Sequence, residues 1–165
     1  MDNLTAFYDL AKKMNEKLSL IPLLFGSTGL QLLVDDELNP ADIDIAVPQI
    51  MRPTRSEMCA DLTAFMQNEG YALTDLNEGE FAKGEIVVEI STLGDFKDYA
   101  GVDVTECPII QANGAIFKLL TLEQFLSVYT SSAECEWRHR DVEDVENYVN
   151  EDQVKAEIVK KALAR

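Results

Sequence analysis

The sequence predicts an α/β fold of the α+β type, in which a mixed β-sheet is flanked by helices and the chain ends in helices. Two observations support this prediction. Segments with apolar residues at every third or fourth position alternate with segments in which they recur at every second position, and these are the periods of helices and strands. In residues 23–47, a short apolar strand, a Gly-Ser turn, a short helix and a strand with alternating charge follow one another.

The first part of the chain is predicted to alternate helices with strands. Residues 2–19 carry apolar side chains at helical spacing, and we expect an amphipathic helix that covers the sheet. Residues 23–25 are predicted to be a buried strand, and a short helix follows over residues 28–34. After a polar loop, residues 42–47 are predicted to form the second strand.

The middle of the chain is predicted to contain a helix and a hairpin. Thr54 is expected to cap a helix that ends at Gly70. A tight turn at Gly84 is expected to join the two strands of a hairpin. The strands predicted in this part are residues 71–73, 80–83 and 85–90. Residues 95–114 are interpreted as irregular, with short edge strands near residues 102–104 and 108–110.

The last part is predicted to be mostly helical. A strand over residues 115–120 leads to a helix capped by Thr121, and two more helices are expected over residues 137–149 and from residue 152 to the end. The whole chain, residues 1–165, is predicted to be one domain. Its core is expected at about residues 20–120 and its C-terminal helical part at about 121–165.

Two aspartates of the second strand are the first candidates for a functional site. Side chains on a strand alternate between its faces, so Asp42 and Asp44 point to the same side. Two neighbouring carboxylates repel one another unless a cation lies between them, and Mg²⁺ suits such a pair because it takes oxygen ligands and substrate phosphates. Gly26 and Ser27 are candidates for phosphate binding, because glycine allows close approach and a helix start offers free N–H groups.

This order of elements resembles the signature of the nucleotidyltransferase superfamily, which has the DNA polymerase β-like fold. That signature is a hydrophobic residue, Gly, Gly or Ser, a spacer, and then acid-hydrophobic-acid-hydrophobic. In this chain it is Phe25-Gly26-Ser27, a spacer over residues 28–41, and Asp42-Ile43-Asp44-Ile45. The spacer is long, so a loop insertion before the second strand is expected. The predicted nucleotidyltransferase fold follows from this resemblance.

The resemblance implies a Mg²⁺-dependent enzyme that moves a nucleoside monophosphate from an NTP, such as ATP, to a hydroxyl of a small-molecule or protein acceptor. Asp42 and Asp44 would be catalytic and would bind one or two Mg²⁺ ions. A third carboxylate comes from a neighbouring strand in this family, and Glu89 is the candidate here, with Glu85 as the alternative. The implied nucleotide-binding residues are Gly26, Ser27, Thr28, Arg138 and Arg140.

The C-terminal part resembles the small nucleotidyltransferases of bacterial toxin–antitoxin and resistance systems, because Arg140-Asp141 and Asp144 match a basic residue followed by Asp-x-x-Asp. Those proteins usually have a lysine on the helix after the last strand, where this chain has Tyr129, unless Lys118 takes that role. The basic cluster at residues 138–140 has two interpretations, pairing with nearby acidic residues or contact with the triphosphate.

The missing lysine, and Glu89 where the family usually has an aspartate, leave a second function open. The chain would then be a catalytically inactive binding or regulatory protein with the nucleotidyltransferase fold, such as a nucleotide sensor or an antitoxin-like partner. A third interpretation is an α/β domain without nucleotide chemistry.

Charge and composition narrow the range of partners. The 165 residues include 30 acidic and 14 basic ones, for a net charge of −16 and a pI near 4.3, which disfavours a large nucleic acid as partner. No apolar run is long enough to span a membrane, and the first residues lack a secretion signal. The cysteines at 59, 107 and 135 form no Cys-x-x-Cys pair, so reduced thiols and a cytoplasmic protein are expected.

Overall fold

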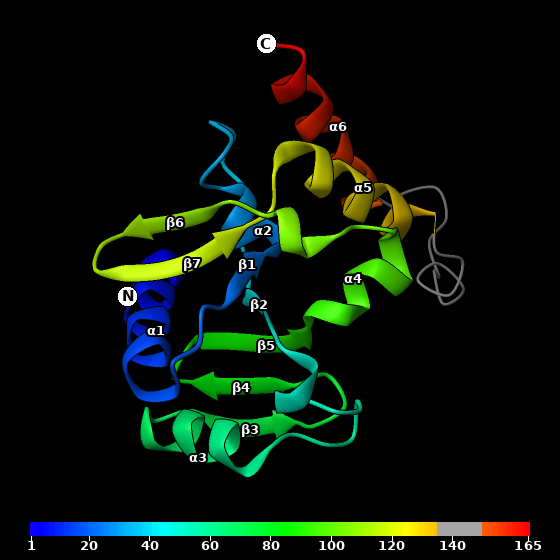
Figure 1. The fold of residues 1–165 in the computed structure, drawn as a ribbon. Helices are drawn as coiled ribbons and strands as arrows, with labels where there is room; N and C mark the ends of the chain where they lie inside the picture. Colours follow the sequence, from blue (N-terminus) through cyan, green and yellow to red (C-terminus); the bar gives the residue numbers. More distant parts are fainter. Residues whose placement is uncertain (135–149) are drawn as a thin grey trace.

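The structure is a computed structural model that describes residues 1–134 and 150–165. Seven strands form one sheet in the order β3-β4-β5-β2-β1-β7-β6 (Figure 1). The sheet is mixed, because β1 pairs with β7 and β2 pairs with β5 in parallel while the other pairs are antiparallel. The strands are β1 (Leu23–Phe25), β2 (Ile43–Val47), β3 (Ala72–Asp75), β4 (Glu80–Lys83), β5 (Ile86–Thr92), β6 (Ile109–Ala112) and β7 (Ala115–Leu119). The predicted mixed sheet is confirmed.

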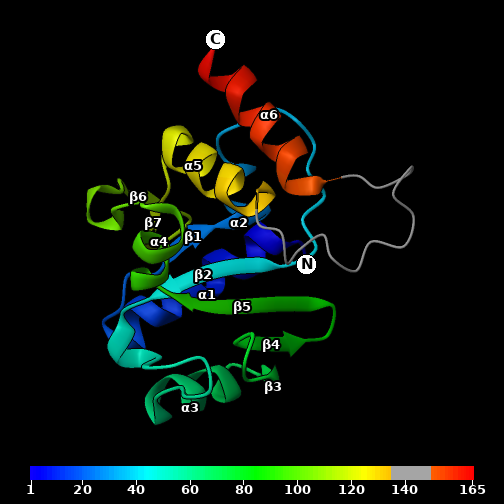
Figure 2. The ribbon, with the colours of Figure 1, turned by 90° about the vertical axis from the view of Figure 1, so that its right-hand side faces the viewer.

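The helices flank this sheet, as predicted. They are α1 (Asn3–Leu18), α2 (Gly26–Leu30), α3 (Ala60–Asn68), α4 (Leu93–Ala100), α5 (Leu122–Ala133) and α6 (Glu151–Leu163), with short 3₁₀ helices at Gln49–Met51 and Val104–Glu106. Figure 2 shows α5 and α6 side by side, above β2 and β5, which are interior strands of the sheet. Within the described part of the chain, no helix has the length and apolarity that crossing a membrane requires.

Helix α1 packs its apolar stripe on the sheet, as its periodicity predicts. Phe7 is buried and meets Phe117 of β7 edge to face, with ring centroids 5.0 Å apart. Burying a side chain of this size stabilises the fold by about 1.5–3 kcal/mol. Asn15 fixes the end of the helix, because its amide donates to the carbonyls of Leu20 and Ile116 and accepts from the N–H of Ile116.

Three local predictions are corrected by the structure. Helix α2 begins at Gly26 and ends at Leu30, whereas the sequence predicted residues 28–34. Helix α3 begins at Ala60 instead of near Thr54, because the Sγ of Cys59 accepts the N–H of Leu62 and caps it. Helix α4 extends over residues 95–100 of the segment 95–114 that the sequence assigned to an irregular region, and residues 102–104 form no strand.

A capping signal explains why α4 forms. The carboxylate of Asp95 accepts the backbone N–H of Thr92 at 3.2 Å, and Gly101 ends the helix in a left-handed conformation. The predicted cap of α5 is confirmed, because Thr121 and Gln124 exchange side-chain and backbone hydrogen bonds. The helix predicted over residues 137–149 lies outside the described residues, and the last predicted helix is α6.

Candidate functional site

Three carboxylates meet where β2 and β5 run side by side. These strands pair in parallel with Asp44 opposite Glu89, so both side chains emerge on the same face, and Asp42 immediately precedes β2. One carboxylate oxygen from each of Asp42, Asp44 and Glu89 lies within 4.8 Å of the others. Among the described residues, this is the one cluster of three or more His, Cys, Asp or Glu side chains that could hold a metal ion.

The sequence left two glutamates, Glu89 and Glu85, as candidates for the third carboxylate, and the structure distinguishes between them. Glu89 joins the aspartates, whereas Glu85 is exposed at the turn before β5 and is not part of the cluster. The three clustered side chains are partly buried, so they remain accessible to a ligand. We name Asp42, Asp44 and Glu89 the carboxylate triad.

The triad carries unbalanced negative charge. Burial, followed by the charges of Asp42 and Glu89, raises the pKa of Asp44 well above its ordinary value. Burial and then Asp42 also raise the pKa of Glu89. No Lys or Arg of the described residues forms an ion pair with the triad. A bound cation would therefore relieve a repulsion that the fold itself maintains.

Gly26 is required next to the triad for two reasons. Its φ of +66° is a backbone conformation that residues other than glycine rarely adopt. A Cβ at this position would lie 2.9 Å from the Cγ of Asp44 and would overlap that carboxylate. Phe25, just before it, is paired with Asp44 across β1 and β2. The glycine thus makes room for Asp44 as well as turning the chain into α2.

Ser27 and Thr28 follow at the start of α2 but differ in accessibility. Ser27 is partly exposed, whereas Thr28 is buried and donates its hydroxyl to the backbone carbonyl of Asp42 at 2.7 Å. Asn3 of α1 donates to the same carbonyl at 3.4 Å and to that of Pro40 at 2.9 Å. Thr28 and Asn3 therefore fix the backbone at Asp42, a role for which the sequence held no signal.

The basic residues predicted for nucleotide contact are only partly described. Arg138 and Arg140 lie outside the described residues. Lys118 lies on β7, which β1 separates from β2.

Tyr129 of α5 is buried beside Ser27, and burial raises the pKa of its phenol. Lys155 of α6, which sequence reasoning missed, places its ammonium group 5.7 Å from the ring centre of Tyr129.

Comparisons with known proteins bear on the family and the fold. No protein-family model matches the sequence. The chain is 36% identical over 134 residues to "Uncharacterized protein YnaI" of Bacillus subtilis (strain 168), and the match covers 81% of this chain and 84% of that protein.

Solved structures resemble the whole chain. An antigenic nucleotidyltransferase-like protein from Paracoccidioides brasiliensis has a TM-score of 0.61 at 13% identity, over 99% of this chain and 86% of that one. ANT(2'')-Ia in complex with adenylyl-2''-tobramycin has a TM-score of 0.56 at 14% identity, over 97% of this chain and 88% of that one. At these identities the likeness shows the fold alone.

Proposed function

We propose that this chain, which belongs to the family of Bacillus subtilis YnaI and has the nucleotidyltransferase fold, transfers a nucleoside monophosphate from an NTP to an acceptor hydroxyl. In this reaction the acceptor oxygen bonds to the α-phosphorus, the bond from that phosphorus to the β-phosphate oxygen breaks, and pyrophosphate leaves. The observation that supports the proposal is the carboxylate triad, whose oxygens lie within 4.8 Å of one another at β2 and β5 and which forms no ion pair with a described Lys or Arg.

The triad fits Mg²⁺. Its donors are carboxylate oxygens, which Mg²⁺ prefers, and a few such ligands leave room for water and phosphate oxygens. When bound, the ion supplies charge neutralisation at the phosphates and stabilises the transition state. Asp42 and Asp44 would hold it, and Glu89 would either complete the ligand set or accept the proton of the acceptor hydroxyl.

The Gly26-Ser27 turn would hold the β- and γ-phosphates. The first N–H groups of a helix have no partner within the helix, so those of Ser27 and Thr28 can point to an anion. The Ser27 hydroxyl would add a side-chain contact. Thr28 would contribute through its backbone, because its hydroxyl already binds the carbonyl of Asp42.

A second candidate function is nucleotide binding without transfer, in a regulatory protein. The observation that favours it is Tyr129, a buried phenol where the resembled enzymes have a lysine that reaches the nucleotide. Both functions require Mg²⁺-dependent nucleotide binding at the same triad, and only the first produces pyrophosphate.

The test combines binding with turnover. Nucleotide binding would be measured by calorimetry with each NTP, with and without Mg²⁺. Pyrophosphate release and transfer of label from an α-labelled NTP would then be followed with candidate acceptors. Asp42→Asn and Asp44→Asn should abolish both, whereas Glu85→Gln, in the turn between β4 and β5, should keep both. Binding without any transfer would favour the regulatory protein, and full activity in both aspartate variants would refute both functions.

A further inference from the structure

The backbone carbonyl next to Glu89 of the carboxylate triad lacks its usual partner in the sheet. β4 and β5 pair antiparallel with Glu80 opposite Glu89, so Gly79 lies opposite Ile90. A hydrogen-bonded pair of this kind ordinarily exchanges two N–H···O bonds. The N–H of Ile90 donates to Gly79 at 2.9 Å, but the N–H of Gly79 donates to Leu76 within the turn, at 3.1 Å. The carbonyl of Ile90 is therefore left without a backbone donor from β4.

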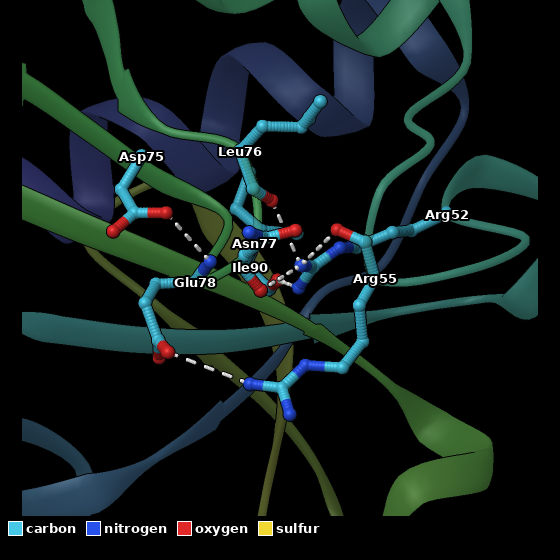
Figure 3. A network of polar contacts seen from close by, with 7 residues as sticks. All are labelled: Arg52, Arg55, Asp75, Leu76, Asn77, Glu78 and Ile90. Carbon is cyan, nitrogen blue, oxygen red and sulfur yellow. Dashed lines mark hydrogen bonds and ion pairs between the residues drawn. The ribbon is translucent and has the colours of Figure 1, made fainter.

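Arg52 supplies the missing donor. One terminal nitrogen of its guanidinium group donates to the carbonyl of Ile90. The other donates to the carbonyls of Leu76 at 3.0 Å, Asn77 at 2.7 Å and Arg55 at 3.0 Å (Figure 3). The side chain is almost fully buried, because the residue is 5% exposed. One arginine thus joins β5 to the β3–β4 turn and to its own loop.

This set of contacts depends on the residue type at two positions. Arginine presents five N–H donors in a rigid planar fork, whereas lysine offers three donors from a single atom. Gly79 has a φ of +63°, and a Cβ at this position would lie 2.7 Å from the Nη1 of Arg52 and would overlap the carbonyl oxygen of Ile90. Arg52 reaches the carbonyl of Ile90 only because residue 79 is a glycine.

Both strands that carry the triad are thus fixed by buried side chains. At the start of β2, Thr28 donates its hydroxyl to the carbonyl of Asp42 at 2.7 Å. On β5, Arg52 holds the carbonyl of the residue after Glu89. Arg52 acts on the backbone and not on the triad charges, because it forms no ion pair with a described carboxylate. Since Asp44 lies opposite Glu89, a shift of β5 at this point changes the separation of their carboxylates.

We propose that Arg52 is a positioning residue for metal binding. It fixes β5 so that a carboxylate oxygen of Glu89 stays within 4.8 Å of those of Asp42 and Asp44. This inference rests on the proposed function, in which the triad holds Mg²⁺. Arg52 itself contacts neither the ion nor the nucleotide, because both of its terminal nitrogens are engaged with backbone oxygens.

The test is Mn²⁺ binding to the nucleotide-free protein, measured by the EPR signal of the free ion. Mn²⁺ takes the same oxygen ligands as Mg²⁺, and about 0.15 M salt screens the surface charges. Arg52→Met, which keeps an apolar stem and removes the fork, should weaken binding by about tenfold, as changes to residues that orient metal ligands do. Arg52→Lys keeps the charge without the fork and should weaken binding similarly. Wild-type affinity in either variant would overturn the inference.

Asn15→Ala separates positioning from a general loss of stability. The amide of Asn15 also binds two backbone carbonyls, those of Leu20 and of Ile116 on β7, which β1 separates from β2. This variant should lower the melting temperature, as Arg52→Met should, but should change Mn²⁺ affinity by less than about twofold, because it leaves the metal ligands and their supports in place. Equal losses of Mn²⁺ affinity in the two variants would show that Arg52 only supports the fold.

Gly79→Ala disturbs the same contact without removing the arginine, and it keeps the inference testable if the Arg52 variants do not fold. It should also weaken Mn²⁺ binding by about tenfold, because the new Cβ displaces the guanidinium group. Gly84→Ala is the matched control, since Gly84 has a similar φ of +60° and no atom within 4 Å of an added Cβ. Equal Mn²⁺ affinities of the two alanine variants would refute the role of Arg52.

Failure of the proposed function gives a different result. If the wild-type protein and Asp44→Asn bind Mn²⁺ alike, the triad holds no metal ion, and the proposed function falls together with this inference. If Asp44→Asn loses Mn²⁺ and Arg52→Met binds it like the wild-type protein, the metal site stands and the positioning role of Arg52 is refuted.

Discussion

Glu69 and the carboxylate triad are both withdrawn from solvent, but they differ in what surrounds them. The side chain of Glu69 is 8% exposed, and it pairs with Lys13 at 2.9 Å and Lys17 at 2.6 Å, two lysines of α1. Its hydrogen bond with Lys17 and then that with Lys13 hold its pKa below the ordinary value, against the effect of burial. The triad has no described lysine or arginine in an ion pair, and the pKa values of Asp44 and Glu89 are raised by burial and neighbouring carboxylates.

Under the proposed function, this difference separates a structural carboxylate from the three that would bind a metal ion. The charge of Glu69 is balanced within the chain, so its pairs join α1 to the end of α3 and leave nothing for a ligand. The triad is held together by the paired strands β2 and β5 despite its repulsion, and no described lysine or arginine balances its charge in an ion pair. Carboxylates whose pKa is raised, so that their charged form is disfavoured, are common at functional sites for this reason.

The largest expected effect is on the triad. Asp44→Asn should lower nucleotidyl transfer by about 10²-fold or more, because one metal ligand is weakened at the point where charge develops. The measurement is the rate of pyrophosphate release at saturating NTP. Glu69→Gln should leave that rate nearly unchanged, and a similar loss in both variants would erase the distinction between the two regions.

Gly26→Ala should have the second-largest effect, a loss of both stability and nucleotide binding. Strain at a positive φ costs of order 1–3 kcal/mol, and the new Cβ would also displace the Asp44 carboxylate. Gly84→Ala is the matched control, because Gly84 has a φ of +60° with no atom within 4 Å of an added Cβ. Urea unfolding of both variants should show the larger loss for Gly26→Ala, and nucleotide binding should fall in that variant alone.

The pairs of Glu69 should contribute a smaller amount of stability. Glu69→Gln should lower the free energy of unfolding by about 1 kcal/mol at neutral pH, because both lysines can return to solvent. Since folding lowers this pKa, the stabilisation is present above the unfolded value of 4.5 and is lost as the pH falls through the folded value. Denaturation from pH 7 to 3 should show the two proteins converge, and a constant difference would contradict the ionic origin.

The smallest expected effect is a gain in stability, in contrast to the loss expected for Glu69→Gln. Glu89→Gln should stabilise the metal-free protein by about 0.5 kcal/mol, because like charges directly opposite on paired strands destabilise them. The measurement is urea unfolding with a chelator at neutral pH. Glu85→Gln should show no such gain, and destabilisation by Glu89→Gln would show that its charge is compensated within the chain.

The comparison also shows which parts of the site the sequence could predict. Strand alternation placed Asp42 and Asp44 on one face, and the resemblance correctly predicted the nucleotidyltransferase fold. Choosing between Glu85 and Glu89 required the parallel register of β2 and β5, which joins residues about 45 positions apart. No local pattern encodes that register.

Other features were beyond sequence reasoning for related reasons. Arg52 binds backbone carbonyls, and any residue could supply these, so it left no pattern. The lysine partners of Glu69 lie more than 50 positions away along the chain. Helix α4 was missed although Thr92 and Asp95, three residues apart, formed a capping signal at its start. The division into a core and a C-terminal helical part stays a prediction, as do the roles of Arg138 and Arg140.

The most direct test of the account is the melting temperature of the protein with each NTP, with and without Mg²⁺. A ligand that binds only the folded state raises this temperature by mass action. The account predicts an increase that requires both Mg²⁺ and the nucleotide and disappears in an Asp42→Asn/Asp44→Asn double variant. An equal increase in the double variant, or none with any nucleotide in the wild-type protein, would contradict the claim that the triad is a metal-dependent nucleotide site.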